Sequence, residues 1–260
     1  MNNIKFEIQN QIGIIRFNRP EVLNSFTIEM SNEFAATLNT CSEDKNIRAI
    51  YLTGNGRGFC AGQDINEFLA SSQNEIHLGE ILKKTYEPII LKIREIEKPI
   101  VCGVNGVAAG AGANIALACD FVVASEKASF IQSFSKIGLI PDAGGSFFLP
   151  RLVGFSKATE LLMLADKVLA LDAEKIGMIY KCVPGNLLEE VSLKLAERLS
   201  KMPTKAIGYI KKLMNESFSN NLQNQLSLEA KLQELAGFTK DFKEGINSFL
   251  EKRNPNFTGE

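Results

Sequence analysis

Apolar and polar side chains alternate along the first residues of the chain. The alternation covers residues 4–9 and 12–18, and the polar pair Asn10-Gln11 separates the two runs. A period of two is typical of strands with one buried face, and a short polar connection is typical of a hairpin. The chain is therefore predicted to open with two antiparallel strands.

Extended and helical patterns then follow one another along the first half of the chain. Apolar residues at helical spacing begin after Thr27, which is predicted to cap that helix. They recur over 82–96, where Pro88 is expected to kink or break the helix. Apolar runs predict strands at 47–53, 99–104 and 121–124, and a short buried helix at 113–119. This order favours an α/β protein with crossover connections.

Only helical periodicity remains after about residue 184. Apolar side chains recur every three or four residues in the stretches 188–199, 207–214, 222–235 and 242–249. A purely helical tail on an α/β body indicates packing either onto the body or onto a partner subunit. The chain is thus expected to divide into an α/β core at 1–200 and a helical region at 201–260.

The overall composition excludes several classes of function. The chain has 260 residues, 45% of them hydrophobic and 23% charged, which is typical of a globular protein rather than a disordered one. Its formal net charge of -1 gives no electrostatic reason to expect nucleic acid or an anionic membrane as partner. The single histidine, His77, excludes a metal site with two histidine ligands and is expected to be an ordinary surface residue. No metal site is predicted.

Cysteine usage and the N-terminus indicate a cytoplasmic protein. The five cysteines are scattered, without a C-x-x-C pair, which is typical of reduced thiols. The first residues show no basic stretch followed by an apolar run, so no signal peptide is expected. Residues 100–119 carry no charge and are long enough for a membrane span, but they include Asn105, Asn114 and four glycines. A buried strand, a turn and a buried helix explain that run better.

Three stretches combine glycines with polar residues and are candidates for chemistry. They cover residues 60–65, 105–114 and 138–145. In the second, small residues let the backbone approach a ligand, and the following helix begins with unpaired N–H groups. With a second N–H from the first stretch, two donors could converge on a carbonyl oxygen as an oxyanion hole. The alternative is that the glycines only permit tight packing, and glycine content alone favours that alternative.

In this order and spacing, the three stretches resemble the crotonase superfamily of enoyl-CoA hydratases and isomerases. The resemblance extends to residues 18–24, 150–154 and 244–253 and so covers almost the whole chain. It implies an α/β fold, a spiral of ββα units, with a C-terminal helical trimerisation region at 201–260, assembled as a homotrimer or a dimer of trimers. It also implies an acyl-CoA substrate and no cofactor other than the coenzyme A of that substrate.

The resemblance implies roles for specific residues. The backbone N–H groups of Gln63 and Ala111 would form the oxyanion hole. The other positions implied to contact the substrate or its coenzyme A are Leu23, Ala61, Gly62, Asp64, Ile65, Gly110, Asn114, Phe134 and Lys252. Asp64 could equally cap a helix that begins at Ile65, and Lys252 could belong to a solvated tail.

The chain departs from the hydratases of this family at two positions. Those enzymes use two glutamates, whereas the equivalent positions here hold Asn114 and Phe134. Neither side chain can act as a general base, so hydration by two carboxylates is disfavoured. Asp142 remains, at a position where related isomerases and dehalogenases carry a working aspartate. The run around it, together with Gln63, resembles most closely the ring-1,2-epoxyphenylacetyl-CoA isomerases of phenylacetate catabolism.

A single carboxylate suits enolate chemistry. With an oxyanion hole stabilising a thioester enolate, Asp142 could take a proton from C2 and return it at C4, or promote opening of an epoxide to an oxepin. Apolar surroundings, including Phe134, would raise its pKa toward a useful value. Asp142 could instead be a turn or N-cap residue, or the nucleophile of a dehalogenase. Another enolate-forming enzyme of hydratase type and a catalytically silent acyl-CoA-binding protein are the remaining alternatives.

Overall fold

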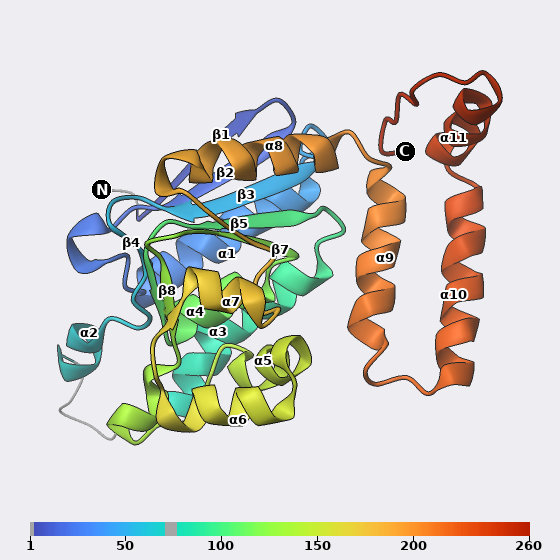
Figure 1. Cartoon of the computed structure of the whole chain (residues 1–260). Helices are drawn as coiled ribbons and strands as arrows, with labels where there is room; N and C mark the ends of the chain where they lie inside the picture. The colour runs from blue at the N-terminus through green and yellow to red at the C-terminus, as the bar shows by residue number, and fades with distance from the viewer. Residues whose placement is uncertain (1–2, 71–76) are drawn as a thin grey trace.

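Two β-sheets form the body of the molecule in the computed structural model, which describes residues 3–70 and 77–260 (Figure 1). The first two strands of the larger sheet are antiparallel, as the alternating pattern predicted, and its other neighbours are parallel. Its six strands follow the order β1 (Ile4–Gln9), β2 (Ile12–Phe17), β3 (Ala49–Gly54), β5 (Ile100–Val104), β7 (Phe121–Ser125) and β10 (Lys181–Val183).

Three strands of the smaller sheet each directly follow a strand of the larger sheet along the chain. The smaller sheet has the order β4 (Gly58–Cys60), β6 (Val107–Ala109), β8 (Ser129–Ile131) and β9 (Val168–Leu169), with only β9 antiparallel to its neighbour. Each of β3, β5 and β7 therefore continues after a short turn into a strand of the smaller sheet, and helices follow. This repeat is the predicted α/β spiral of ββα units, which is confirmed.

Helices cover the two sheets. Thr27 caps the first of them as predicted, because its Oγ1 accepts the Met30 N–H at 3.1 Å. Of the kink or break expected at Pro88, the break does not occur, since α3 continues through it while packing its apolar face on α1 and α4. The helices of the body are α1 (Ile28–Glu43), α2 (Ile65–Ala70), α3 (Leu78–Glu95), α4 (Ala111–Ala118), α5 (Gly145–Val153), α6 (Phe155–Leu164) and α7 (Ala170–Lys175), with 3-10 turns η1 (Pro20–Val22), η2 (Ser133–Ile137) and η3 (Gly185–Leu187).

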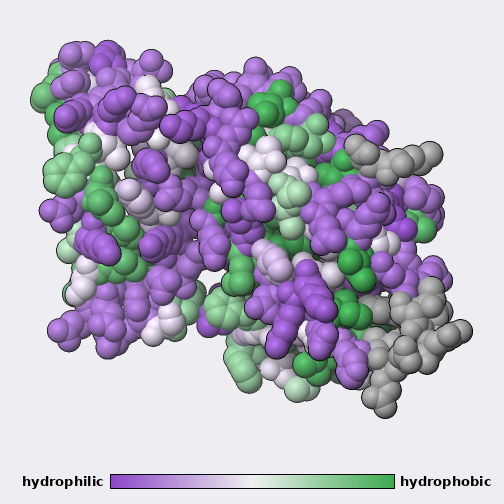
Figure 2. Space-filling model, turned by 180° about the vertical axis from the view of Figure 1, so that it is seen from behind, coloured by the Kyte–Doolittle hydropathy of each residue, from purple (hydrophilic) through white to green (hydrophobic). Residues whose placement is uncertain are grey.

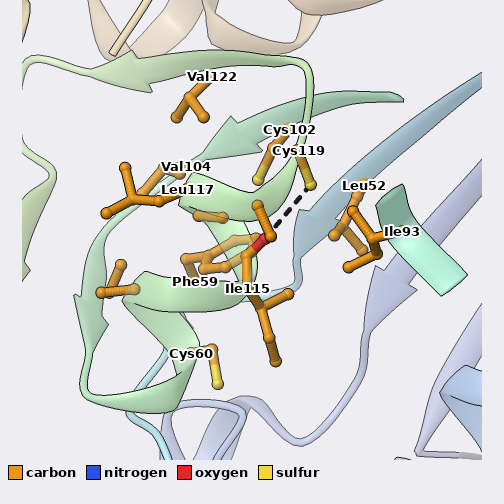
Figure 3. Packing of buried hydrophobic residues seen from close by; sticks show 14 of the residues in the cluster. Leu52, Phe59, Cys60, Ile93, Cys102, Val104, Ile115, Leu117, Cys119 and Val122 are labelled. Carbon is orange, nitrogen blue, oxygen red and sulfur yellow. Dashed lines mark hydrogen bonds between the residues drawn. The ribbon is translucent and has the colours of Figure 1, made fainter. Parts of the chain in front are cut away.

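Helix α4 lies within the core of the body, and all eight of its residues are buried. Figure 3 shows Ile115 and Leu117 of this helix among side chains of the larger sheet, and the Cys119 thiol donates to the Ile115 carbonyl oxygen at 3.4 Å. The uncharged run 100–119 is thus divided into β5, β6 and α4, as expected. Among the described residues, no helix is long and apolar enough to cross a membrane.

After β10 the chain is helical, as predicted. Helix α8 (Leu188–Ser200) lies on the larger sheet, where Leu188 and Ala196 pack against strand residues. Helices α9 (Thr204–Glu216), α10 (Leu222–Gly237) and α11 (Lys240–Leu250) form an arm beside the body (Figure 1). The expected boundary between 1–200 and 201–260 falls between α8 and α9. Residues 201–260 are called the C-terminal arm below, and their role in assembly stays a prediction.

Buried polar contacts fasten this arm to the body. Lys211 of α9 is 6% exposed and pairs with Asp120 at 2.8 Å, and Asp120 also pairs with Arg94 of α3 at 3.2 Å. Near the end of the chain, Arg48 donates to the carbonyl oxygen of Phe257 at 2.6 Å. The arm is therefore held at its first helix and at its last residues.

Candidate active site

The turn after β4 is held by a short bridge to Phe26. The Phe26 N–H donates to the Gly62 carbonyl oxygen at 2.7 Å, and the Asp64 N–H donates to the Phe26 carbonyl oxygen at 2.8 Å. Gln63 lies between these contacts, so its own N–H points away from Phe26. Gly62 has a φ of 93°, a conformation that favours glycine.

The turn between β6 and α4 supplies a second backbone donor. Gly110 has a φ of 52° and precedes Ala111, the first residue of α4, whose N–H has no acceptor within the helix. A Cβ added to Gly62 would lie 3.6 Å from the Ala111 nitrogen, so the two turns are in contact. Within the described part of the chain, neither the Gln63 N–H nor the Ala111 N–H has a hydrogen-bond acceptor. Two unpaired donors therefore lie close together.

Two glycines of the stretch 105–114 serve packing, the alternative that glycine content favoured: Gly106 lies before β6 and Gly112 within α4. A Cβ added to Gly112 would lie 2.5 Å from the carbonyl oxygen of Cys60, and one added to Gly106 would overlap the carbonyl oxygen of Arg57. A side chain at either position would push β6 and α4 away from β4. Tight packing and close approach of the two donors are thus consequences of the same glycines.

Asp142 lies in the loop between η2 and α5 with its carboxylate largely buried. Its Oδ1 has no hydrogen-bond partner among the described residues, and burial raises the pKa of Asp142 to about 6. It lines a cavity of about 260 Å³ with Tyr86, Ile90 and Leu91 of α3. The N-cap of α5 is Gly144, so the interpretation of Asp142 as a cap is wrong. A buried carboxyl group with a raised pKa has the character of a general base.

Asn114 of α4 supports the Asp142 loop. It is fully buried, its Nδ2 donates to the Asp142 carbonyl oxygen at 2.8 Å, and its Oδ1 accepts Gln132 Nε2 at 2.7 Å. A Cβ added to Gly145 would overlap the Asn114 amide, so the start of α5 packs directly on it. Asn114 therefore fixes the backbone of Asp142 relative to α4, the helix that carries the Ala111 N–H.

A tyrosine hydroxyl also reaches the site, and the sequence interpretation missed it. Tyr86 belongs to the apolar stripe predicted for α3 and is interpreted from the sequence only as a core residue. Its hydroxyl nevertheless donates to Gln63 Oε1 at 2.6 Å. Burial raises the pKa of Tyr86 well above its ordinary value, and the nearby Asp142 adds to this. The signal that could have found it is a hydroxyl on the otherwise apolar face of a helix.

The other residues of the first turn hold its structure. Asp64 pairs with Arg19 at 3.0 Å. Burial alone would raise the pKa of Asp64, but hydrogen bonds from Arg19 and from the start of α2 outweigh it, so the pKa lies below its ordinary value. α2 begins at Ile65, as the capping interpretation of Asp64 predicted, and Ile65 itself is 59% exposed. The carbonyl oxygen of Leu23 accepts the Ala61 N–H at 3.0 Å.

Phe134 and Lys252 lie in different parts of the molecule. Phe134 is buried, and its ring lies 3.6 Å from the Cβ position of Gly110, beside the second turn. Lys252 follows α11, at the side of the molecule away from α2 (Figure 1). The contribution of Lys252 to the site stays a prediction, and it requires a neighbouring copy, because within one chain α9–α11 extend beside the body.

Two further reactive side chains were weighed from the sequence. His77 is exposed at the start of α3, as expected for a surface residue. Burial raises the pKa of the Cys60 thiol to about 12, so a thiolate nucleophile is absent there at neutral pH. Within residues 3–70 and 77–260, no group of three or more His, Cys, Asp or Glu side chains is placed to hold a metal ion.

The spiral of ββα units is shared with a known family of enzymes. The family model for enoyl-CoA hydratase/isomerase matches residues 7–260, so the chain belongs to this family, which is part of the crotonase superfamily. It is 42% identical over 260 residues to the 1,2-epoxyphenylacetyl-CoA isomerase of Escherichia coli (strain K12), covering 100% of this chain and 99% of that protein. A Rhodobacter capsulatus protein named probable enoyl-CoA hydratase is 42% identical over 258 residues, covering 99% and 98%. The solved enoyl-CoA hydratase of Bacillus anthracis has a TM-score of 0.93 at 31% identity, covering 99% and 100%.

Proposed function

We propose that this protein is an acyl-CoA isomerase that acts through a thioester enolate. The favoured reaction converts 1,2-epoxyphenylacetyl-CoA to oxepin-CoA, and conversion of a 3-enoyl-CoA to a 2-enoyl-CoA uses the same chemistry. The observation that carries the proposal is the Asp142 carboxylate, which has a raised pKa and faces a small cavity beside α3. The name of the Escherichia coli relative supports the favoured reaction. The only coenzyme required is the coenzyme A of the substrate.

In the proposed mechanism, the thioester carbonyl oxygen accepts hydrogen bonds from the N–H groups of Gln63 and Ala111. Asp142 takes the proton from C2, and the electron pair of the broken C–H bond forms an enolate whose charge these N–H groups stabilise. Return of the proton at C4 moves the double bond of an enoyl substrate and restores the carboxylate. In the epoxide, ring expansion to the oxepin breaks the carbon–carbon bond that the two rings share, and its electrons join the π system of the oxepin. Asp142 moves the C2 proton to a ring carbon, which leaves a double bond conjugated to the thioester. Proton return leaves the atoms of substrate and product balanced.

A hydratase-type reaction is the second candidate, because Glu87 also lines the cavity. Hydration requires one group to activate water and another to protonate carbon. Glu87 is exposed, whereas Asn114 and Phe134 occupy the positions where the resemblance implies the hydratase glutamates. We therefore rank hydration below isomerisation. Addition of water to a 2-enoyl-CoA, measured as loss of conjugated thioester absorbance and abolished by Glu87→Gln, would reverse this order.

The C-terminal arm supports a proposed homotrimer or dimer of trimers. Apolar side chains remain exposed along it, and Figure 2 shows green patches on its surface, at the left of that view. Such patches are typical of surfaces that another subunit covers. In the assembly, Lys252 of one copy would bind the coenzyme A phosphates at the site of a neighbouring copy. The exposed apolar residues of the arm include Ile210, Met214, Phe218, Leu222, Leu226, Phe238 and Phe249.

Two substrate assays test the proposed function. Purified protein is incubated with a 3-enoyl-CoA while the conjugated thioester absorbance is followed, and separately with 1,2-epoxyphenylacetyl-CoA. The Asp142→Asn variant should keep its fold and acyl-CoA affinity and lose about 10²- to 10⁴-fold in turnover. Because the base must be ionised, wild-type kcat should rise with pH through about 6 and then level off. If neither reaction occurs, or neither depends on Asp142, the proposal is wrong.

The dehalogenase alternative predicts a different intermediate at the same residue. With a halogenated acyl-CoA, a nucleophilic Asp142 would displace the halide and form a covalent ester with the acyl group, whereas a base leaves the carboxylate unmodified. Mass spectrometry of protein quenched during turnover distinguishes the two. We expect the unmodified mass, and an adduct on Asp142 would replace the isomerase by a nucleophilic mechanism.

A further inference from the structure

The turn after β4, which carries the Gln63 N–H, is called the oxyanion turn below. Three side chains beside it form a hydrogen-bonded row, and the proposed mechanism does not use this row. Tyr86 of α3 is 2% exposed and donates to Gln63 Oε1 at 2.6 Å, while Gln63 Nε2 donates to Glu67 Oε2 at 3.0 Å. Glu67 of α2 also accepts the Ile28 N–H at 3.1 Å. The row Tyr86–Gln63–Glu67, called the polar clamp below, thus connects α3, the oxyanion turn, α2 and the start of α1.

Chemistry determines the direction of each hydrogen bond in the polar clamp. An ionised carboxylate only accepts, so the amide NH2 of Gln63 must face Glu67. The amide oxygen of Gln63 then faces Tyr86, and the tyrosine must donate. Burial raises the pKa of Tyr86 well above its ordinary value, so the hydroxyl keeps the proton it donates at neutral pH. The row therefore has one consistent arrangement of donors and acceptors.

The polar clamp holds the residue whose backbone N–H is assigned to the oxyanion hole. The bridge to Phe26 holds the backbone on either side of Gln63, and the clamp holds the Gln63 side chain at both of its polar atoms. We propose that Tyr86 is a positioning residue, which aims the Gln63 N–H at the thioester oxygen by anchoring the Gln63 side chain. This inference rests on the proposed function, since it assigns a catalytic consequence to the aim of that N–H.

Packing alone is the competing explanation for Tyr86. Its ring lies 6.0 Å from the ring of Phe26, centroid to centroid, and forms part of the wall of the Asp142 cavity. Tyr86→Phe keeps this ring and removes only the hydroxyl. Tyr51 offers a matched control, because it is equally buried but lies in β3, in a separate apolar cluster with Leu188 of α8. Tyr51→Phe therefore removes a buried hydroxyl that has no connection with the site.

The kinetic test compares these two variants in the isomerase assay. Complete loss of an oxyanion donor costs about 10²- to 10³-fold in kcat, so a donor that is present but misaligned should cost about tenfold. We expect Tyr86→Phe to show this loss in kcat with KM changed less than about twofold, and Tyr51→Phe to match the wild type. Gln63→Leu should give a similar loss, and the double variant should lose no more, because Tyr86 acts through Gln63.

A spectroscopic measurement reports on the oxyanion hole without turnover. The absorbance of cinnamoyl-CoA moves to longer wavelength when hydrogen bonds polarise its thioester carbonyl. Tyr86→Phe should reduce this shift, and Tyr51→Phe should preserve it. Kinetics and a spectral shift of Tyr86→Phe that equal those of Tyr51→Phe would overturn the positioning role. Losses that multiply in the Tyr86→Phe, Gln63→Leu double variant would also overturn it, since they would show independent action.

Failure of the proposed function gives a different pattern. Wild-type protein that neither isomerises an acyl-CoA nor shifts cinnamoyl-CoA absorbance overturns the proposed function, and with it the catalytic consequence of the polar clamp. Amide hydrogen exchange in the free protein then tests whether the Tyr86 hydroxyl holds the turn that contains Gln63. Residues 59–64 should exchange faster in Tyr86→Phe than in Tyr51→Phe. Equal exchange would show that the hydroxyl of Tyr86 does not hold this turn.

Discussion

Helices α4 and α10 represent two different environments in this molecule. Every residue of α4 is buried, whereas Leu232 is the one buried residue of the 16 in α10. On α10, Leu222 and Leu226 are 76% and 53% exposed although they follow helical spacing. The sequence of α4 is therefore constrained on all sides by its own chain, whereas we propose that the apolar stripe of α10 packs on a surface outside the chain.

This contrast separates two kinds of residue change. Around α4, packing and the site use the same groups, since Gly112 contacts β4, Ala111 offers a donor and Asn114 holds the Asp142 loop. A change there should affect stability and activity together. In the C-terminal arm, a change of an exposed apolar residue should leave the single chain stable and affect assembly. The predictions below test this contrast, beginning with the largest expected change in stability.

The contact between α4 and β4 should be the most sensitive to substitution. Gly112→Ala places a Cβ 2.5 Å from the Cys60 carbonyl oxygen, a backbone atom that cannot move aside alone. We expect a loss of at least about 3 kcal/mol in the free energy of unfolding, together with most activity. Gly79→Ala in α3 is the control, because nothing lies within 4 Å of its Cβ position. Urea unfolding compares the two, and similar stabilities would refute the tight contact at Gly112.

The second largest loss of stability is expected when the buried amide of Asn114 is removed. Asn114→Ala leaves Gln132 Nε2 without its acceptor and removes one of the two donors that the described residues offer to the Asp142 carbonyl oxygen, which keeps only the Gly145 N–H. We expect a cost of about 1 to 3 kcal/mol in the free energy of unfolding. The control Asn46→Ala removes an exposed amide and should change stability by less than about 0.5 kcal/mol. Urea unfolding measures both effects. Equal stabilities would show that the Asp142 loop does not depend on α4.

The third prediction concerns Asp142, whose buried carboxylate should lower the free energy of unfolding. Its folded pKa of about 6 exceeds the ordinary 3.8, so ionisation is disfavoured in the folded state. Below pH 3.8 the group is neutral in both states, and the penalty grows as pH rises through this interval and is complete above about 6. At about 1.4 kcal/mol per pKa unit, the shift from 3.8 to about 6 means that Asp142→Asn should stabilise the protein by about 3 kcal/mol at pH 7.5. It should have little effect at pH 3.5. Urea unfolding at the two pH values measures this, and a gain that is independent of pH would contradict it.

The sequence predicted those parts of the fold that repeat over enough residues to show a period. The hairpin of β1 and β2, the longer parallel strands and the C-terminal helices have such patterns. The smaller sheet was missed because β4, β6, β8 and β9 have only two or three residues each. Pro88 misled for another reason: a local rule about the backbone was outweighed by the packing of the apolar face of α3.

For the site as well, the sequence identified residues in local motifs and missed contacts that depend on tertiary packing. Gln63, Ala111 and Asp142 became candidates because they belong to motifs, and the structure brings the two turns together and buries the carboxylate. Tyr86 was missed because its hydroxyl meets Gln63 only through tertiary packing. Lys252 shows the limit of reasoning from one chain, because in a single copy it lies away from the two turns and the proposed contact with coenzyme A requires a neighbouring copy.

The smallest change in single-chain stability is expected on α10, where the contrast with α4 is most direct. Replacing both Leu222 and Leu226 by Gln alters side chains that are already exposed, so the isolated chain should change by less than about 0.5 kcal/mol. Light scattering after size exclusion should nevertheless show a smaller assembly than for wild type or for the control Glu229→Gln. Since association stabilises by mass action, the wild-type melting temperature should rise with protein concentration, and that of the double variant should not. A wild-type protein that stays monomeric at every concentration would mean that the exposed stripe of α10 is not an interface between copies. The difference between α4 and α10 would then be one of burial alone and would carry no information about assembly.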